Sequence, residues 1–210
     1  VKKLWQFLPQ ADFWKTVGFS FVRIVSGFLL GLFAGTILAA AACGCKVLEI
    51  LLAPVVTVMK SVPVASFIIL CLIWIPSRNL SVFITFLMVF PAVYTNVCQG
   101  IRETDRELLE MAQVFQVSFG RKVRYIYISQ AAPYFQAACR LALGLCWKAG
   151  VAAEVIGITG GSIGEKLYHA KIYLNTPDLF AWTIVIIGIS VLFEKLFLTG
   201  IGILVERMGK

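Results

Sequence analysis

Apolar runs of membrane-crossing length recur along this chain and are separated by shorter polar segments. Four of these runs are residues 17–42, 80–99, 132–157 and 179–204. A helix needs roughly 20 apolar residues to cross about 30 Å of hydrocarbon, and each run is long enough. Because lipid offers no hydrogen-bond partners to the backbone, each run is predicted to be a helix.

A further apolar stretch, residues 46–76, is too long for one straight span and is interrupted by Pro54 and Pro63. A proline removes a backbone donor and disturbs the helix around it. The sequence therefore predicts a short helix near the inner surface, a bend at residues 60–63 and a span at 62–76. With this span the chain is expected to cross the membrane five times.

Glycines repeat along the first of these runs. Gly27, Gly31 and Gly35 are spaced four residues apart and so share one face of the predicted helix. Small residues at this spacing allow a second helix to approach closely within a membrane. We expect another span to pack against this face.

The basic residues are distributed unevenly between the polar segments, which predicts the orientation of the spans. Five of them follow the third span: Arg102, Arg106, Arg121, Lys122 and Arg124. Loops rich in lysine and arginine remain in the cytoplasm, so this loop is placed there. Because successive spans cross the membrane in opposite directions, the N-terminal segment is then predicted to lie on the outer side. With five spans, this start implies either an inserted N-terminal segment or one missing upstream helix.

Composition places the whole chain in the membrane. Of 210 residues, 60% are hydrophobic and 14% are charged, whereas a soluble domain is nearer half apolar and a quarter charged. The net charge of +8 does not indicate nucleic-acid binding, because no basic face is interleaved with aromatic residues. The six cysteines lie mostly in apolar runs and lack the spacing of a metal site. No metal site is expected.

A long polar segment between the third and fourth spans interrupts the apolar pattern. Its apolar residues share one helical face at three- and four-residue spacing: Leu108, Met111, Ala112, Phe115 and Phe119. A second, acidic face is formed by Glu103, Glu107, Glu110 and Val114. Two interpretations fit this helix. It either anchors the loop at the membrane surface or docks in the groove of a cytoplasmic partner.

The same segment resembles a known family. The stretch EMAQVFQVSFGRKVRYIYISQAAPYF is similar to the EAA loop of ABC-importer permease subunits, whose pattern is Glu-Ala-Ala, three residues, Gly, nine residues and Ile-x-Leu-Pro. The register starts at Glu110. Gln116 takes the glycine position and Ser129 the proline position, so we expect Gly120 to supply the bend. Pro133 and the later stretch GLCWKAGVAAEVIG resemble the nitrate, sulfonate and taurine branch.

This resemblance implies an all-α membrane protein with five transmembrane helices, arranged as in a type I ABC importer permease of the methionine-permease kind. The whole chain, 1–210, would be a single transmembrane permease domain with a coupling helix at about residues 105–120. In the family this helix docks on a cytoplasmic ATPase. The residues that the resemblance assigns to docking are Glu107, Leu108, Glu110, Met111, Ala112, Phe115, Gln116, Phe119 and Gly120.

The implied function is that of the permease subunit of an ATP-driven importer in the bacterial cytoplasmic membrane. Its partners would be a cytoplasmic ATP-binding cassette ATPase, a second permease subunit in a homodimer, an extracytoplasmic solute-binding protein and the lipid bilayer. The chain would be no enzyme and would bind no cofactor, because ATP and Mg belong to the ATPase. The solute would be a small anion such as nitrate, a sulfonate or taurine, or else a pyrimidine precursor of thiamin.

Charged residues inside the predicted spans are costly and are candidates for the translocation pathway or its gate. Lys148 lies deep in the fourth span, next to Trp147, and Glu154 lies near the outer end of that span. Arg23 lies in the outer part of the first span. It either contacts the solute or extends to the outer surface, as long basic side chains do.

No catalytic arrangement accompanies these charges. The stretch TGGSIG lacks the Lys-Ser/Thr of a phosphate-binding loop, and the single histidine, His169, has no nucleophile at useful spacing. A membrane-embedded enzyme would need polar residues clustered at one depth. The remaining alternative, an ATP-independent channel or secondary transporter, would predict internal repeats or rings of charge, and the sequence contains neither.

Overall fold

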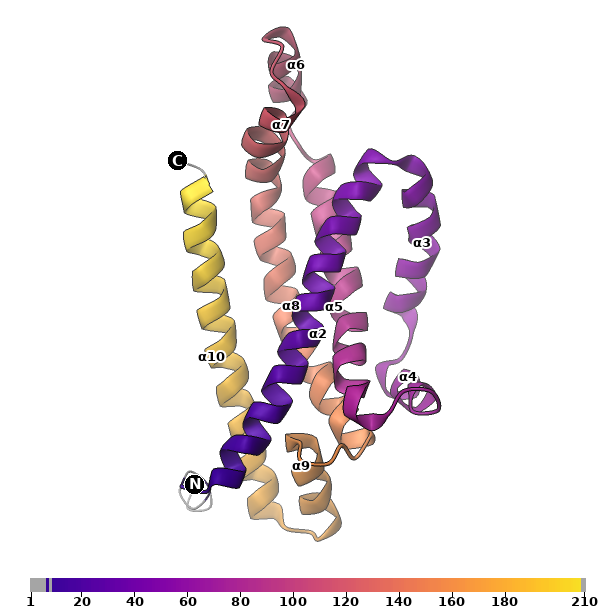
Figure 1. Ribbon diagram of the computed structural model, residues 1–210, viewed down its shortest axis with the longest axis vertical. Helices are drawn as coiled ribbons and strands as arrows, with labels where there is room; N and C mark the ends of the chain where they lie inside the picture. The colour runs from indigo at the N-terminus through magenta and orange to yellow at the C-terminus, as the bar shows by residue number, and fades with distance from the viewer. Residues whose placement is uncertain (1–6, 8, 209–210) are drawn as a thin grey trace.

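The computed structural model describes residue 7 and residues 9–208, and every regular element within them is a helix (Figure 1). The other residues of the predicted domain 1–210 lie outside this described part. Four long helices run side by side along the long axis: α2 (Ala11–Gly44), α5 (Ser77–Arg102), α8 (Ile128–Ile156) and α10 (Thr176–Met208). They correspond to the four long apolar runs, and the all-α class is confirmed.

Close packing of α2 against α5 forms the centre of the bundle. A β-carbon added to Gly27 would collide with the carbonyl oxygen of Val82, and one added to Gly31 would lie 2.8 Å from the Val89 side chain. Gly35 continues the same contact one turn further along. The predicted glycine face is confirmed, and the helix that packs against it is α5.

The stretch 46–76 folds differently from its prediction. It forms α3 (Lys46–Ser61) and α4 (Val64–Cys71), whose axes differ by 104°. α3 runs from the end of α2 to about mid-height of the bundle, and does not lie along the inner surface (Figure 1). α4 has eight residues and is only about 12 Å long, too short to cross the bilayer. The predicted span at 62–76 is therefore corrected to a broken segment formed by α3 and α4 together.

The break falls within the predicted bend at residues 60–63. Val62 has extended backbone, with φ −73° and ψ 127°, which is the conformation that a following proline favours. Pro63 then caps the start of α4. Pro54, by contrast, lies inside α3 without ending it. The sequence did not distinguish these two prolines.

By length and composition, α2, α5 and residues 176–203 of α10 can each cross a membrane, and the bent α3–α4 pair is a fourth candidate. α8 is 29 residues long and runs alongside them, but it carries Arg140, Lys148 and Glu154. The count of five crossings stays a prediction.

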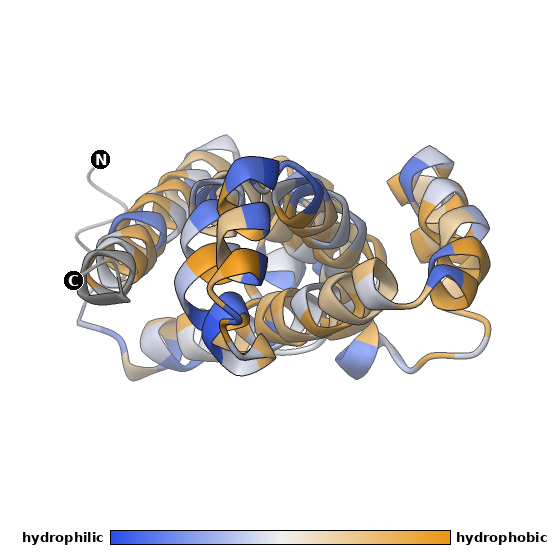
Figure 2. Ribbon diagram, turned by 90° about the horizontal axis from the view of Figure 1, so that it is seen from above, coloured by the Kyte–Doolittle hydropathy of each residue, from blue (hydrophilic) through white to orange (hydrophobic). Residues whose placement is uncertain are grey.

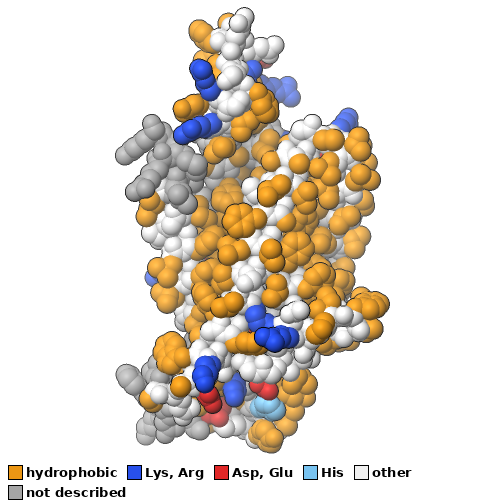
Figure 3. Space-filling model, viewed as in Figure 1, with side chains coloured by type: hydrophobic (Ala, Val, Ile, Leu, Met, Phe, Trp, Pro, Cys, Tyr) orange, Lys and Arg blue, Asp and Glu red, His pale blue; other side chains and the backbone are white. Residues whose placement is uncertain are grey.

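The surface and the position of α3 are consistent with a membrane-embedded bundle. Hydrophobic side chains cover the middle of the face in Figure 3, and lysine and arginine gather toward its two ends. Seen from above, α3 stands to one side of the four long helices (Figure 2). We name the two ends of the bundle the α6 end and the α9 end, after α6 (Arg106–Val114) and α9 (Ile163–Ile172), which lie there.

Candidate functional site

α6 projects beyond the long helices at its end of the bundle (Figure 1). It begins at Asp105, whose side chain accepts a hydrogen bond of 2.9 Å from the backbone N–H of Glu107. A carboxylate at this position satisfies one of the free amides of the first turn and is favoured by the helix dipole. α6 therefore begins at Asp105, where the resemblance places the start of the coupling helix.

The end of α6 corrects the predicted helix at 105–120. The helix stops at Val114, and Gln116 adopts a φ angle of 52°. The Val117 N–H then donates to the Ala112 carbonyl at 2.9 Å, which closes a Schellman cap. Gln116, at the family's glycine position, makes the bend itself. Gly120 does not, because it lies within the short helix α7 (Phe119–Lys122).

The exposed face of α6 and α7 is apolar and partly aromatic. Phe115 is 75% exposed, Phe119 78% and Met111 51%, and Val114, which the prediction placed on the acidic face, is 78% exposed. Ala112 is 2% exposed and so cannot contact a partner, which corrects its assignment to docking. A patch of large apolar side chains at a polar end of the protein indicates an interaction surface.

Charged and polar residues surround this apolar patch. Glu107, Glu110, Gln116 and Gly120 are exposed, while Leu108 is half-buried. Neither glutamate forms an ion pair within the described part of the chain. The two carboxylates are therefore available to a basic partner.

The α6 segment is joined directly to two packed helices. It follows α5, and beyond α7 the chain continues through a π-helical turn (Val123–Tyr127) into α8. α5 and α8 meet closely near this end, because a β-carbon on Gly100 would lie 2.7 Å from that of Tyr134. A force applied to α6 would therefore act on both helices.

A buried carboxylate ties three helices together at the α9 end. Glu154 of α8 is fully buried, and its Oε2 accepts a hydrogen bond of 2.7 Å from the Ser20 hydroxyl of α2. The same oxygen accepts a weaker bond of 3.4 Å from the Gly164 N–H. Ser20 in turn accepts from the Ile163 N–H at 2.9 Å. The start of α9 is thus fixed against α2 and α8.

Arg23 lies beside this carboxylate and is also buried, with 8% of its surface exposed. Its guanidinium donates to the Ser77 carbonyl at 3.4 Å and lies 4.7 Å from the centre of the Phe19 ring. The Thr159 hydroxyl donates to the same carbonyl at 3.0 Å. Arg23 thus extends to the start of α5 and is covered there, and the choice between a solute contact and an outer-surface position stays a prediction. Its charge is within electrostatic range of Glu154.

The other two pathway candidates lie elsewhere. Trp147 is 4% exposed and packs between Phe21 and Phe193, with ring centres 6.0 Å and 6.3 Å away. Lys148, the next residue of α8, is exposed and shares a face with Leu141. The structure places Arg23 and Glu154 within electrostatic range of each other, Trp147 in the core and Lys148 on an exposed face.

The sequence model of the family described as "Binding-protein-dependent transport system inner membrane component" matches residues 27–210. The chain belongs to this family. It is 29% identical over 167 residues to a candidate aliphatic sulfonate transport permease, SsuC, of Bacillus subtilis, which covers 79% of this chain and 60% of that protein. It is 30% identical over 152 residues to the nitrate import permease NrtB of Synechococcus elongatus, which covers 72% and 54%.

A third member of the inner membrane component family, the bicarbonate permease CmpB of Synechococcus elongatus, is 23% identical over 191 residues, or 90% of this chain and 68% of that protein. The chain spans less than two thirds of the length of the first two relatives. A crystal structure of an amino acid ABC transporter with histidines matches with a TM-score of 0.59 at 18% identity, covering 91% and 90% of the two chains. This likeness shows a shared fold.

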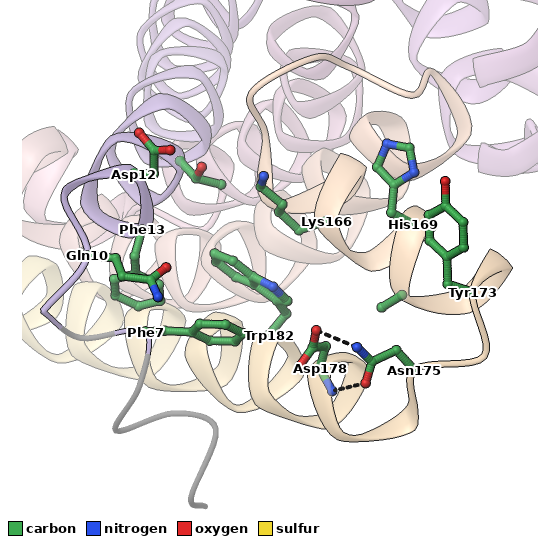
Figure 4. Close-up of a pocket in the computed structure, with 12 residues that line it drawn as sticks. Phe7, Gln10, Asp12, Phe13, Lys166, His169, Tyr173, Asn175, Asp178 and Trp182 are labelled. Carbon is green, nitrogen blue, oxygen red and sulfur yellow. Dashed lines mark hydrogen bonds between the residues drawn. The ribbon is translucent and has the colours of Figure 1, made fainter.

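The chain also has a cavity of about 310 Å³ at the α9 end (Figure 4). Lys166 and His169 of α9 face Asp12 and Trp182 across it. The Nε2 of His169 lies 3.8 Å from a Glu165 oxygen. Among the described residues no group of three His, Cys, Asp or Glu side chains is placed to hold a metal ion.

Some residues that form the contacts described above could not be identified from the sequence. Ser20 and Glu154 are 134 positions apart, and a lone serine in an apolar run predicts nothing. Spacing alone assigned Val114 to the acidic face, and its 78% exposure at the last residue of α6 had no signal in the sequence.

Proposed function

We propose that this chain is the membrane-spanning permease subunit of an ATP-driven, binding-protein-dependent importer. Family membership and the shared fold support this function. The observation that carries it is the exposed face of α6 and α7 beyond the membrane bundle. This face has Phe115, Met111 and two glutamates that form no ion pair with the described residues. An apolar patch bordered by carboxylates suits a groove with a basic margin.

Coupling follows from how α6 is held. Its Asp105 cap and the cap at Gln116 fix both ends, and the segment continues into α5 on one side and α8 on the other. ATP and Mg would be bound by the partner ATPase. When that ATPase changes shape, a docked α6 would move both helices as a unit, because a rigid element transmits displacement without absorbing it.

The remaining partners follow from the same function. A second copy of this chain would complete the pathway, and a solute-binding protein would deliver solute at the α9 end. The named relatives handle aliphatic sulfonates, nitrate and bicarbonate, all of them anions. We infer a small anion as the solute, and a pyrimidine precursor of thiamin is the second candidate.

The docking role predicts the outcome of a double substitution, Glu110→Ala with Phe115→Ala. Removing one carboxylate and one exposed ring from α6 should weaken ATPase association at least about tenfold, since buried aromatic anchors dominate interfaces. Solute-stimulated ATP hydrolysis and uptake by the complex in liposomes should fall in parallel. Co-purification and ATPase assays measure these effects.

The matched control is Phe33→Ala, which truncates a ring that is 62% exposed on the apolar face of α2. It should leave ATPase association unchanged. Wild-type uptake and ATPase stimulation by the α6 double variant would rule out the docking role.

A further inference from the structure

The break between α3 and α4 borders a cavity of about 490 Å³ that lies against α5. The last turn of α3, one face of α5 and two leucines of α8, Leu141 and Leu145, form its walls. The break is at about mid-height between the α6 end and the α9 end (Figure 1). At membrane depth, irregular backbone is tolerated where it lines a cavity rather than facing lipid.

Among the described residues Lys60 is the one charged side chain that lines this cavity. It is exposed and forms no ion pair within the described part of the chain. The helix dipole favours a cation in the last turn of α3, which explains a basic residue there. The dipole does not explain a charge at membrane depth without a counter-ion, because such charges are costly and mark the paths of ions and solutes.

Polar groups of α5 line the same cavity as Lys60: Thr95, Asn96 and Gln99. The Thr95 hydroxyl is engaged, since it donates to the Pro91 carbonyl of its own helix. Asn96 donates through Nδ2 to the Ala92 carbonyl at 2.8 Å, which leaves its second amide hydrogen free. The Gln99 amide makes no side-chain hydrogen bond to the described residues. Both amides can therefore donate to a ligand.

A second cavity, of about 470 Å³, continues from the first toward the α6 end and shares Lys60 and Gln99 with it. Its Glu49 pairs with Arg102 at 2.7 Å, so these two charges compensate each other. Glu103 lines this second cavity and not the first. Lys60 lines both cavities and so shares the second with Glu103, whereas the cavity beside the break has no acidic side chain among its described lining residues.

Lys148 extends the positive character toward the α9 end. It lies three residues beyond Leu145 and seven beyond Leu141, so all three share one face of α8. Lys148 is exposed and also forms no ion pair within the described residues. An anion approaching from the α9 end would pass Lys148 and then reach Lys60.

We propose that the cavity between the last turn of α3 and α5 is a binding site for a small anion, in which the Lys60 ammonium supplies the charge and the Asn96 and Gln99 amides supply hydrogen bonds. This inference rests on the proposed function, since it names the residues that select the solute. The acceptor oxygens of a carboxylate, sulfonate or oxyanion suit these donors. A neutral or cationic solute would leave Lys60 uncompensated.

The test measures binding to the detergent-solubilised permease–ATPase complex without a solute-binding protein. Methanesulfonate, nitrate and bicarbonate are titrated separately by calorimetry, with a neutral aminopyrimidine as the contrasting probe. The wild-type complex should bind at least one of the anions. Lys60→Gln should weaken that binding at least about tenfold, because a charge-assisted contact is lost. Lys60→Arg should stay within about threefold.

Lys46→Gln is the matched control, because Lys46 is an exposed lysine at the other end of α3 and lines neither cavity. It should leave anion binding unchanged, and Gln99→Glu should abolish it by adding a negative charge. Equal binding by Lys60→Gln and wild type, or binding of the aminopyrimidine with none of the anions, would overturn the proposal.

The outcome also separates this site from the proposed function. Lys60→Gln should keep wild-type ATPase association and basal ATP hydrolysis, because it leaves α6 untouched. If Lys60→Gln binds anions normally while Glu110→Ala with Phe115→Ala loses coupling, only the anion site is wrong. If neither set of substitutions has an effect, the permease function falls as well.

Discussion

Three residues other than glycine have positive φ angles in the described chain, and each follows the end of a helix: Gln116, Ile158 and Leu174. In all three places the next N–H bonds back to a carbonyl of the last helical turn. Glycine usually occupies this position, because a β-carbon there costs about 1–2 kcal/mol. The chain bears this cost three times, so the turns are fixed by their hydrogen bonds and by packing rather than by local preference.

Gln116→Gly tests this at the α6 cap. Removing the β-carbon should stabilise the turn by about 1 kcal/mol, because glycine adopts positive φ without strain. Hydrogen exchange of the Val117 amide, which donates to Ala112, should slow accordingly. The same change at Gln113, within α6, should have the opposite sign, since glycine destabilises a helix interior. Faster exchange at Val117 in Gln116→Gly would contradict the assigned cap.

Among the helices, the contact between α2 and α5 depends most directly on residue size. Gly27, Gly31 and Gly35 bring the two backbones together, and their spacing alone predicted this face. Four of the helices were likewise predictable, because twenty or more apolar residues in a membrane have few alternatives to a helix.

Gly27→Ala should lower the unfolding temperature of the protein in detergent, although alanine is the better helix former. The added methyl group would meet the carbonyl of Val82, which is backbone and cannot rotate away. Gly18→Ala is the control on the same helix, since nothing lies within 4 Å of its β-position. That variant should be as stable as the wild type or slightly more so. An unchanged melting temperature in Gly27→Ala would show that α2 and α5 can separate without loss.

Other features at the scale of the helix could not be predicted. Pro54 and Pro63 look alike in the sequence, yet only Pro63 ends a helix. The difference lies in the residue before each proline, since Val62 is extended whereas Ala53 is helical within α3. Both prolines disfavour a helical residue before them, so the sequence alone does not say which of the two ends the helix. Likewise, the sequence predicted that Gly120 makes the bend after α6, whereas in the structure Gln116 makes it and Gly120 lies within α7.

Across the whole molecule, α8 connects the two ends. It starts from the π-helical turn beyond α6 and carries Glu154 near its other end, where α2 and α9 are hydrogen-bonded to it. Movement of α6 would therefore reach the α9 end through one continuous helix. These contacts lie far apart in sequence, which is why Arg23 and Glu154 could be proposed singly but not as a pair.

Ser20→Ala tests the connection at the α9 end. The substitution removes the donor to Glu154 and the acceptor of the Ile163 N–H, both buried. Leaving buried polar groups unpaired should destabilise the protein by about 1–3 kcal/mol. Ser26→Ala is the control, because its hydroxyl bonds only to a carbonyl of its own helix. Thermal unfolding in detergent measures both, and equal stability of the two variants would contradict a structural role for Ser20.

The gap between Ser61 and Val64 also has a consequence for hydration. Pro63 has no N–H to offer the carbonyl of Met59, so the end of α3 presents unpaired acceptors at mid-height of the bundle. Lipid tails cannot solvate them, and water in the adjoining cavity can. A solute entering there would exchange its hydration shell gradually, water by water, instead of shedding it at a dry barrier.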